Sequence, residues 1–195
     1  MYIKSRILST IFRIIFIMVC GAGIVMKLME TGVTVNTVMS DFALLAGTLA
    51  VIYFIYLIVA GSGYERGVFR GAVTMYMIVV FIVYYLVYFG FSVIMPSELS
   101  PAGYLLYFVS PLMALLDYIL FCRKGGFGSY SPAIWVLIPL MFNIIIFFIN
   151  RSGIYTHSVS YFSFPGMNMA AAVIMLLGIG YLLFIADNIM AGRRR

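Results

Sequence analysis

Charged side chains are scarce in this sequence. Only 9% of its 195 residues are Asp, Glu, Lys or Arg, whereas 65% are hydrophobic, and a soluble domain carries about 25% charged residues. A surface with so few charges cannot face water on all sides, which excludes a soluble globular protein. Several apolar runs approach or exceed the roughly 18 residues that mark a transmembrane helix. Because backbone groups in lipid must pair within their own segment, we predict an all-α, polytopic integral membrane protein.

Histidine and cysteine are nearly absent as well. The chain has one histidine, His157, and two cysteines, Cys20 and Cys122, which have no partner at metal-ligand or redox spacing. We therefore expect structural thiols, no metal site and no cofactor. No nucleophile elbow, His-Glu-x-x-His motif or glycine-rich phosphate loop is present. The net charge of +6 comes from small basic groups at span ends, a placement typical of membrane topology that gives no indication of nucleic-acid binding.

Six apolar segments are present, separated by short polar or Gly- and Pro-bearing stretches. They leave no room for a soluble domain, so we predict one six-helix transmembrane domain over residues 1–195. The first segment imitates a secretory signal, but five more follow, and we expect it to be retained as a helix. The predicted spans are 8–29, 40–60, 71–95, 104–121, 133–149 and 169–190.

The distribution of Lys and Arg predicts the orientation. With the N-terminus inside, ten of the 12 basic residues lie on the cytoplasmic side, and only Lys27 and Arg151 lie outside. Cytoplasmic segments of membrane proteins carry an excess of Lys and Arg, so both termini are expected in the cytoplasm. Arg13 falls inside the first span, close enough to the inner end for its side chain to snorkel to the interface.

Polar side chains inside spans are costly in lipid and usually face a protein interior or a cavity. The predicted orientation gathers many of them in the outer half of the bilayer. There we predict a polar pocket open toward the outer leaflet, whose partners are membrane lipids or a lipid-like small molecule. The alternative is that these residues simply mark the membrane interface, where tyrosine is enriched. The residues are Thr37, Ser40, Asp41, Tyr107, Ser110, Asn143, Asn150 and His157.

The fourth span contains YFVSPLMALLDY. At about 100° per residue, Ser110, Ala114 and Asp117 share one face, and the small pair allows a neighbouring helix to approach closely. Pro111 removes a backbone hydrogen bond and should kink the helix, with Ser110 able to occupy a freed backbone group.

Two acidic residues are expected near the inner side. We interpret Asp117 as a structural charge, paired with Arg70, Arg123 or Lys124. Asp187 is expected to meet nearby arginines.

Three stretches stand in a recognisable order: PLMALLDYILF (111–121), WVLIPLMFNIIIFFINRSG (135–153) and YFSFPGMN (161–168). In this order they resemble the bacterial branch of the androgen-induced-gene superfamily of six-span membrane proteins. Human members of that superfamily resemble threonine-dependent hydrolases of fatty-acid esters of hydroxy fatty acids. The resemblance extends from about the second span to the end of the chain, and it implies a multi-pass protein of the bacterial plasma membrane.

The resemblance also implies a catalytic pair. The family nucleophile is a threonine in a Thr-x-x-Ser-Asn pattern, which Thr37 to Asp41 matches with Asp41 in place of the asparagine. The partner histidine stands four residues before the proline of the fourth span, and Tyr107 occupies that position. A threonine hydroxyl needs an adjacent base, and tyrosine, with a pKa near 10, is a poor one at neutral pH.

Two functions therefore remain open. The substitution at Tyr107 favours a non-enzymatic membrane protein, such as a small-molecule carrier subunit or a binding scaffold, that binds a lipid or another apolar ligand. The alternative is an intramembrane hydrolase of lipid esters that uses Thr37, with His157 as the only histidine available to serve as its base.

Overall fold

Eight helical segments make up the described part of the chain. The computed structural model describes residues 3, 5–33, 38, 41–60, 67–89, 100–152 and 169–192; within the helices, the side chains of 86–89, 142–143, 145–146, 149–150, 169 and 171 are not described. The segments are α1 (Arg6–Thr31), α3 (Phe42–Val59), α4 (Val68–Phe89), α5 (Pro101–Gly103), the π-helix η1 (Tyr104–Val109), α6 (Ser110–Phe121), α7 (Ser131–Ser152) and α8 (Met169–Gly192).

Each of the six predicted spans coincides with a helix, the fourth with the continuous run α5–η1–α6. The all-α prediction is confirmed for the described residues, which contain no strand. Within them, five helices are long and apolar enough to cross a membrane, and in α7 the apolar stretch found is the shorter Ser131–Met141. The third span was predicted to reach residue 95, but α4 is described only to Phe89 because residues 90–99 lie outside the described part.

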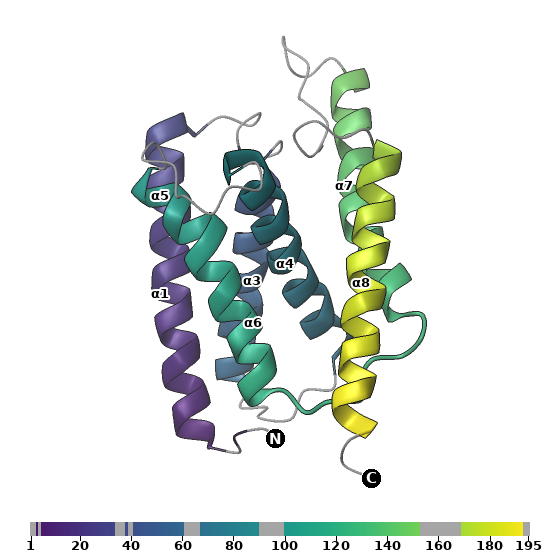
Figure 1. The fold of residues 1–195 in the computed structure, drawn as a ribbon. Coiled ribbons are helices and arrows are strands. Elements are labelled where there is room, and N and C mark those ends of the chain that lie inside the picture. Colours follow the sequence, from purple (N-terminus) through teal and green to yellow (C-terminus); the bar gives the residue numbers. More distant parts are fainter. Residues whose placement is uncertain are drawn as a thin grey trace.

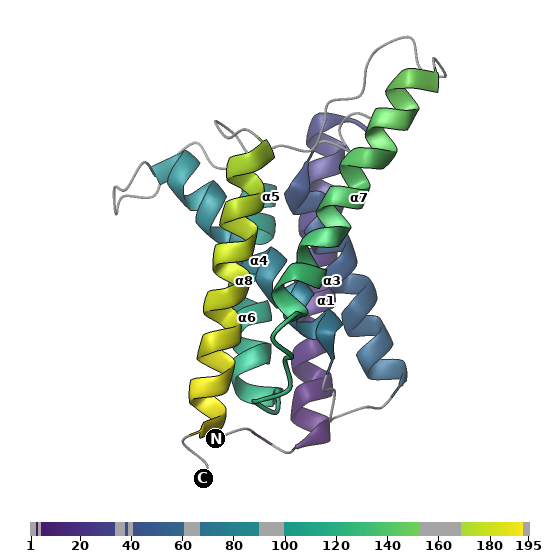
Figure 2. The same cartoon turned by 90° about the vertical axis from the view of Figure 1, so that its right-hand side faces the viewer.

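The helices pack as a bundle centred on α4, which contacts α3, α6, α7 and α8. α1 packs on α3 and α6, and α7 pairs with α8 on the opposite side of the bundle (Figures 1 and 2). The first residues of α1 and the last residues of α8 lie at the same end of the bundle, at the bottom of Figure 1. We call this the near end, and the end where α1 finishes and α3 begins the far end.

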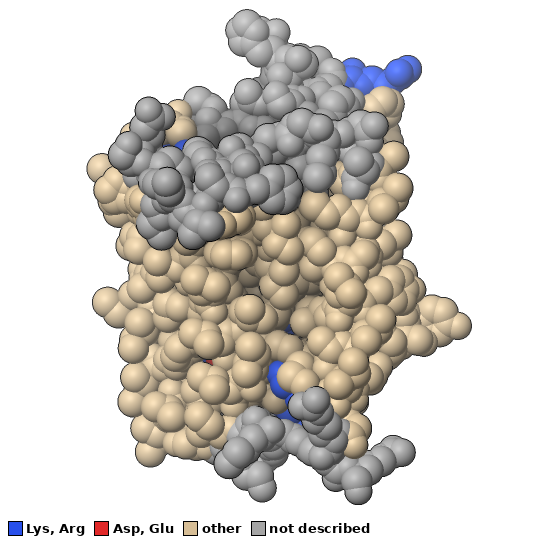
Figure 3. Space-filling view, in the orientation of Figure 1, with Lys and Arg blue, Asp and Glu red and all other residues tan. Residues whose placement is uncertain are grey.

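The outer surface of the bundle is apolar. Large hydrophobic side chains are exposed on several helices, for example Met18 on α1, Ile52 on α3 and Leu182 on α8. The face seen in Figure 3 is mostly tan, with few charged atoms along its length. Exposed apolar surface of this extent suits contact with lipid chains.

Short sequence signals set where the helices begin. Ser5 and Asp41 cap α1 and α3, accepting hydrogen bonds from the backbone N–H groups of Leu8 (3.3 Å) and Ala43 (2.9 Å). Ser100 caps α5 in the same way, directly before Pro101. Ser and Asp are preferred at this position because their side-chain oxygens satisfy the unpaired N–H groups of the first turn.

Pro111 perturbs the fourth span as the sequence predicts, and the perturbation takes the form of a π-helix. η1 occupies the six residues before Ser110, whose backbone N–H bonds to the carbonyl of Leu105, five residues earlier. The Ser110 hydroxyl donates to the same carbonyl at 2.7 Å. That carbonyl already accepts the Ser110 N–H, whereas the carbonyl that Pro111 deprives of its α-helical donor is that of Tyr107, so the prediction that Ser110 occupies a freed backbone group is not confirmed. π-Bulges of this kind are one of the recognised causes of helix distortion.

Pro139 creates a second gap in the helical hydrogen bonds, and a different helix fills it. Proline has no N–H, so the carbonyl of Trp135, four residues earlier in α7, loses its helical donor. The hydroxyl of the buried Tyr76 in α4 donates a hydrogen bond to that carbonyl. Tyr76 thereby ties α4 to α7 at the point where α7 is interrupted.

Replacing Tyr76 by Phe should therefore destabilise the bundle by about 1–3 kcal/mol, because the buried carbonyl of Trp135 is left without a donor. In a Pro139→Ala background the backbone N–H of residue 139 is restored, and the same substitution should cost clearly less. The four proteins of this cycle can be compared by thermal unfolding in detergent. Equal costs of Tyr76→Phe in both backgrounds would contradict the link between Tyr76 and Pro139.

Candidate functional site

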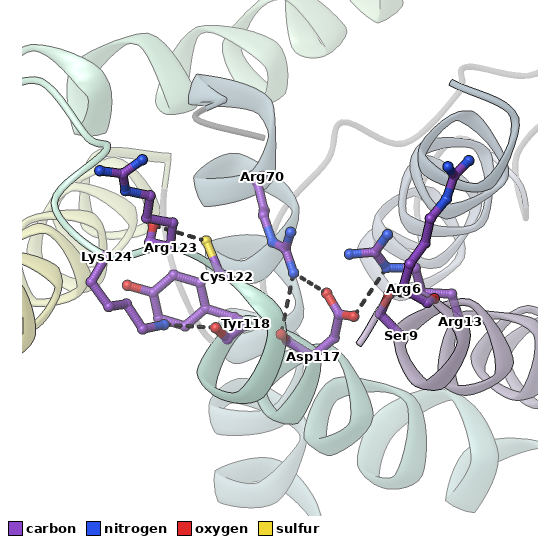
Figure 4. A network of polar contacts seen from close by, with 9 residues as sticks. All are labelled: Arg6, Ser9, Arg13, Arg70, Asp117, Tyr118, Cys122, Arg123 and Lys124. Carbon is purple, nitrogen blue, oxygen red and sulfur yellow. Dashed lines mark hydrogen bonds and ion pairs between the residues drawn. The ribbon is translucent and has the colours of Figure 1, made fainter. Parts of the chain in front are cut away.

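A buried cluster of three charges lies toward the near end. The carboxylate of Asp117 in α6 accepts a hydrogen bond from Nε of Arg13 in α1 at 3.2 Å, and another from Nη2 of Arg70 in α4. Nη2 of Arg70 also donates to the backbone carbonyl of Asp117 at 3.2 Å. Figure 4 shows the carboxylate held between the two guanidinium groups. The exposed fractions are 3% for Arg13, 2% for Arg70 and 1% for Asp117, so all three are removed from solvent.

The cluster confirms part of what the sequence indicates and corrects another part. The pairing of Asp117 with Arg70 is confirmed, as is the shared buried face of Ser110, Ala114 and Asp117. The prediction that Arg13 snorkels to the interface is wrong, because its side chain turns inward to the carboxylate of Asp117. Lys124, a further candidate partner, bonds instead to the backbone carbonyl of Tyr118 at 2.6 Å.

Asp187 of α8 anchors the loop that follows α6. Its carboxylate accepts hydrogen bonds from the hydroxyl of Tyr118 (2.6 Å) and from the backbone N–H groups of Gly125 (2.7 Å) and Gly126 (3.1 Å). Gly125 has a φ of 78°, a left-handed conformation that favours glycine. Among the described residues Asp187 therefore meets a hydroxyl and two backbone amides rather than an arginine, and the nearby arginines at 193–195 lie outside the described residues.

A second polar cluster lies at the far end, around Asp41. Besides capping α3, the carboxylate accepts a hydrogen bond from the hydroxyl of Tyr84 at 3.0 Å and has a longer contact, 3.5 Å, with that of Tyr107. The rings of Tyr84 and Tyr107 stack with centroids 3.9 Å apart, and Nζ of Lys27 lies 5.6 Å from the Tyr107 ring. The structure thus brings two of the predicted site residues, Asp41 and Tyr107, into contact.

The other predicted site residues are placed separately or lie outside the described part. Ser110 follows Tyr107 by three residues and is buried, with its hydroxyl on the carbonyl of Leu105. Asn143 and Asn150 belong to α7, but their side chains are not described. The residues Thr37, Ser40 and His157 lie outside the described residues.

An apolar groove runs along α4 between α3 and α7. It consists of two hollows of about 170 and 420 Å³ that share Leu49, Tyr76 and Ile138. The first hollow begins at Phe42, the first residue of α3, and the second extends to Tyr56 near the end of that helix. We call the two hollows together the α3–α4–α7 groove.

The two cysteines are buried free thiols, as their isolated positions indicate. Cys20 in α1 contacts the carbonyl of Gly47 in α3 at 3.7 Å between sulfur and oxygen. Burial raises the pKa of Cys122, which follows α6, although the nearby Arg70 and Lys124 oppose the shift. A thiol with a raised pKa is a poor nucleophile, in agreement with a structural role.

No protein-family model matches this chain, and comparisons with curated proteins and with solved structures give no match.

Proposed function

We propose that this chain is a six-span integral membrane protein that binds a lipid acyl chain in the α3–α4–α7 groove. The groove itself is the observation that carries the proposal. Its two hollows, about 170 and 420 Å³, together reach the size of ordinary small-molecule sites, which measure about 300–1,000 Å³. Their lining is almost entirely hydrophobic, so a hydrocarbon chain is the matching occupant.

The length of the groove supports a chain-like ligand. Its lining runs from Phe42 at the start of α3 to Tyr56 in the last turn, so it follows most of the length of that helix. Tyr76 forms a floor common to both hollows, and its hydroxyl is fixed on the carbonyl of Trp135. A buried, anchored side chain at this position gives the groove a defined shape rather than a collapsible one.

In the same proposal, the near end of the bundle faces the cytoplasm of a bacterial cell. The described basic residues at the near end are Arg6, Arg13, Arg70, Arg123 and Lys124, whereas the far end has Lys27 and Arg151. This asymmetry is the one that orients membrane proteins. In this orientation the far end of the groove, lined by Phe42, lies in the outer leaflet, and we expect the polar part of a bound lipid at that end of the bundle.

The groove can be tested by filling it. Leu49 lines both hollows, and a Leu49→Trp variant should reduce labelling of the protein by a photoactivatable fatty acid by about tenfold, since an added ring occupies the volume of the chain. Labelling is measured on purified protein by mass spectrometry of the intact chain. Ile174 in α8 is 70% exposed, so Ile174→Trp is the matched control and should label like the unaltered protein. Equal labelling of all three proteins would overturn the proposal.

A second candidate, a threonine-dependent lipid-ester hydrolase, has one specific observation in its favour. Positions 41 and 107, where the resembling family has its asparagine and its histidine, are in contact here at 3.5 Å. Thr37 would be the nucleophile, and Tyr107 or His157 would stand where a base is needed. Hydrolysis of long-chain esters that Thr37→Ala abolishes would favour this candidate, and turnover that survives the substitution would exclude the threonine mechanism.

A further inference from the structure

A pocket separate from the α3–α4–α7 groove lies at the near end, between α1 and α3. Its volume is about 360 Å³. The first turns of α1 supply the polar part of the wall, including Arg6, Thr10 and Arg13, and the end of α3 supplies Leu57 and Ile58. We call it the α1–α3 pocket.

Arg13 is the residue that points to a ligand. Nε of Arg13 is used by Asp117 at 3.2 Å, but Nη2 is buried and has no hydrogen-bond partner among the described residues. A guanidinium carries five donors, and leaving one buried and unpaired costs about 1–3 kcal/mol or more. The unpaired nitrogen belongs to a side chain that lines the pocket and is 3% exposed.

Arg13 also shares its carboxylate, because Asp117 accepts hydrogen bonds from both Arg13 and Arg70. The other described acidic residue at the near end, Asp187, is held by Tyr118 and two backbone amides. An anion in the α1–α3 pocket would give the guanidinium of Arg13 a further acceptor.

We propose that the α1–α3 pocket binds a phosphate group through the guanidinium of Arg13, with Arg6 as the second cation. A guanidinium matches the oxygens of a phosphate in a bidentate geometry, and a phosphate has enough oxygens and charge for two arginines. The hydroxyl of Thr10 lies in the same wall, whereas that of Ser9 already donates to the carbonyl of Arg6 at 2.9 Å.

The apolar part of the pocket wall indicates which kind of molecule carries the phosphate group. Ile7 and Ile11 are exposed on the outer side of α1, beside the polar wall of the pocket. A ligand with a phosphate and adjoining hydrocarbon chains, a phospholipid of the near-end leaflet, satisfies both parts. Free phosphate shares the first chemistry alone. This site requires no ligand in the α3–α4–α7 groove.

The experiment compares ligands that differ only in the phosphate. Purified protein in a maltoside detergent is titrated with phosphatidylglycerol, with diacylglycerol of the same acyl chains, and with inorganic phosphate; binding is read by native mass spectrometry for the lipids and by thermal shift for the ion. Phosphatidylglycerol should bind about tenfold or more tightly than diacylglycerol. A thermal shift with inorganic phosphate, without preference for phosphatidylglycerol, would assign the same site to the free ion.

Variants then locate the site. Arg13→Met should abolish the preference, and Arg151→Met, which removes an exposed arginine at the opposite end of the bundle, should leave it unchanged. Arg6→Met with Thr10→Val leaves the Arg13–Asp117–Arg70 cluster intact and should weaken phosphate binding about tenfold, so the test does not depend on how well Arg13→Met folds. Leu49→Trp should leave the preference unchanged, which separates this site from the groove.

Three results would overturn the proposal. One is a preference for phosphatidylglycerol that is the same in the Arg6 and Arg13 variants as in the unaltered protein. Another is the absence of any phosphate-dependent binding. The third concerns Glu65, an acidic residue that lies outside the described residues. If phosphatidylglycerol is preferred only in a Glu65→Gln variant, Glu65 rather than a phosphate is the partner of Arg13.

Discussion

Asp117→Asn should unfold a large fraction of the protein in detergent, with an expected loss of about 3–5 kcal/mol. The amide is nearly isosteric with the carboxylate, so packing in α6 is preserved while the negative charge disappears. Arg13 and Arg70 are 3% and 2% exposed, and both would lose the negative charge of the carboxylate that lies between them. The loss is measured as a lower midpoint of thermal unfolding and a smaller monodisperse peak in size-exclusion chromatography.

Two further variants test whether the loss of stability comes from the buried charges: a control aspartate substitution and an apolar replacement of the whole cluster. Asp41→Asn removes the same charge at the far end, where Asp41 is half-buried and caps α3. Asparagine is an equally good capping residue, so this substitution should cost less than about 1 kcal/mol. Replacing the whole cluster by Arg13→Met, Asp117→Leu and Arg70→Met should recover most of the stability, because none of the three positions then carries a charge. A triple variant as unstable as Asp117→Asn would show that the loss does not come from unpaired arginines.

The second large effect is expected at Gly71, where α4 meets α7. A Cβ at this position would overlap the indole ring of Trp135, closest to Cζ2 and 2.8 Å from Cε2. Trp135 is 1% exposed, so its ring has no free space into which it can retreat. Gly71→Ala should therefore destabilise the bundle by about 3 kcal/mol, the upper part of the range for overpacked cores. Thermal unfolding in detergent measures the effect.

The same substitution elsewhere supplies the control. Gly178 in α8 has no atom within 4 Å of an added Cβ, and Ala is the better helix former, so Gly178→Ala should be neutral or stabilise by about 0.5–1 kcal/mol. Combining Gly71→Ala with Trp135→Phe removes the overlapping ring atoms, and the pair should cost less than the sum of its members. Strictly additive costs would contradict direct contact between Gly71 and the indole.

Apolar segments predict the helices well because the thickness of a bilayer fixes how many apolar residues a span needs. The partners of buried polar groups depend on something else, namely how each helix is rotated and which helix lies beside it. Pro139 signals an unpaired carbonyl at Trp135, yet only the packing of α4 on α7 shows that Tyr76 is its donor. Arg13 lies near enough to the interface to snorkel, and only the position of α6 shows that it turns inward instead.

The candidate site likewise has features that the sequence predicts and features that depend on how the helices pack. That Asp41 and Tyr107 lie in the same half of the bundle follows from the lengths and directions of the spans, and the structure places them in contact. The stacking of Tyr84 on Tyr107 could not be predicted, because it requires the relative rotation of α4 and η1. The groove and the α1–α3 pocket are likewise spaces between helices, and no stretch of sequence encodes such a space by itself.

The order of synthesis determines when the Arg13–Asp117–Arg70 cluster can form. Asp117 follows Arg13 by 104 residues and Arg70 by 47. At about 5–20 residues per second, α1 waits roughly 5–20 s for the acid that neutralises its buried arginine. Because a buried arginine without its carboxylate is costly, we expect Arg13 to stay hydrated until α6 has been made. The final packing of α1 is then expected to be a late step of assembly, after the fourth span has been synthesised.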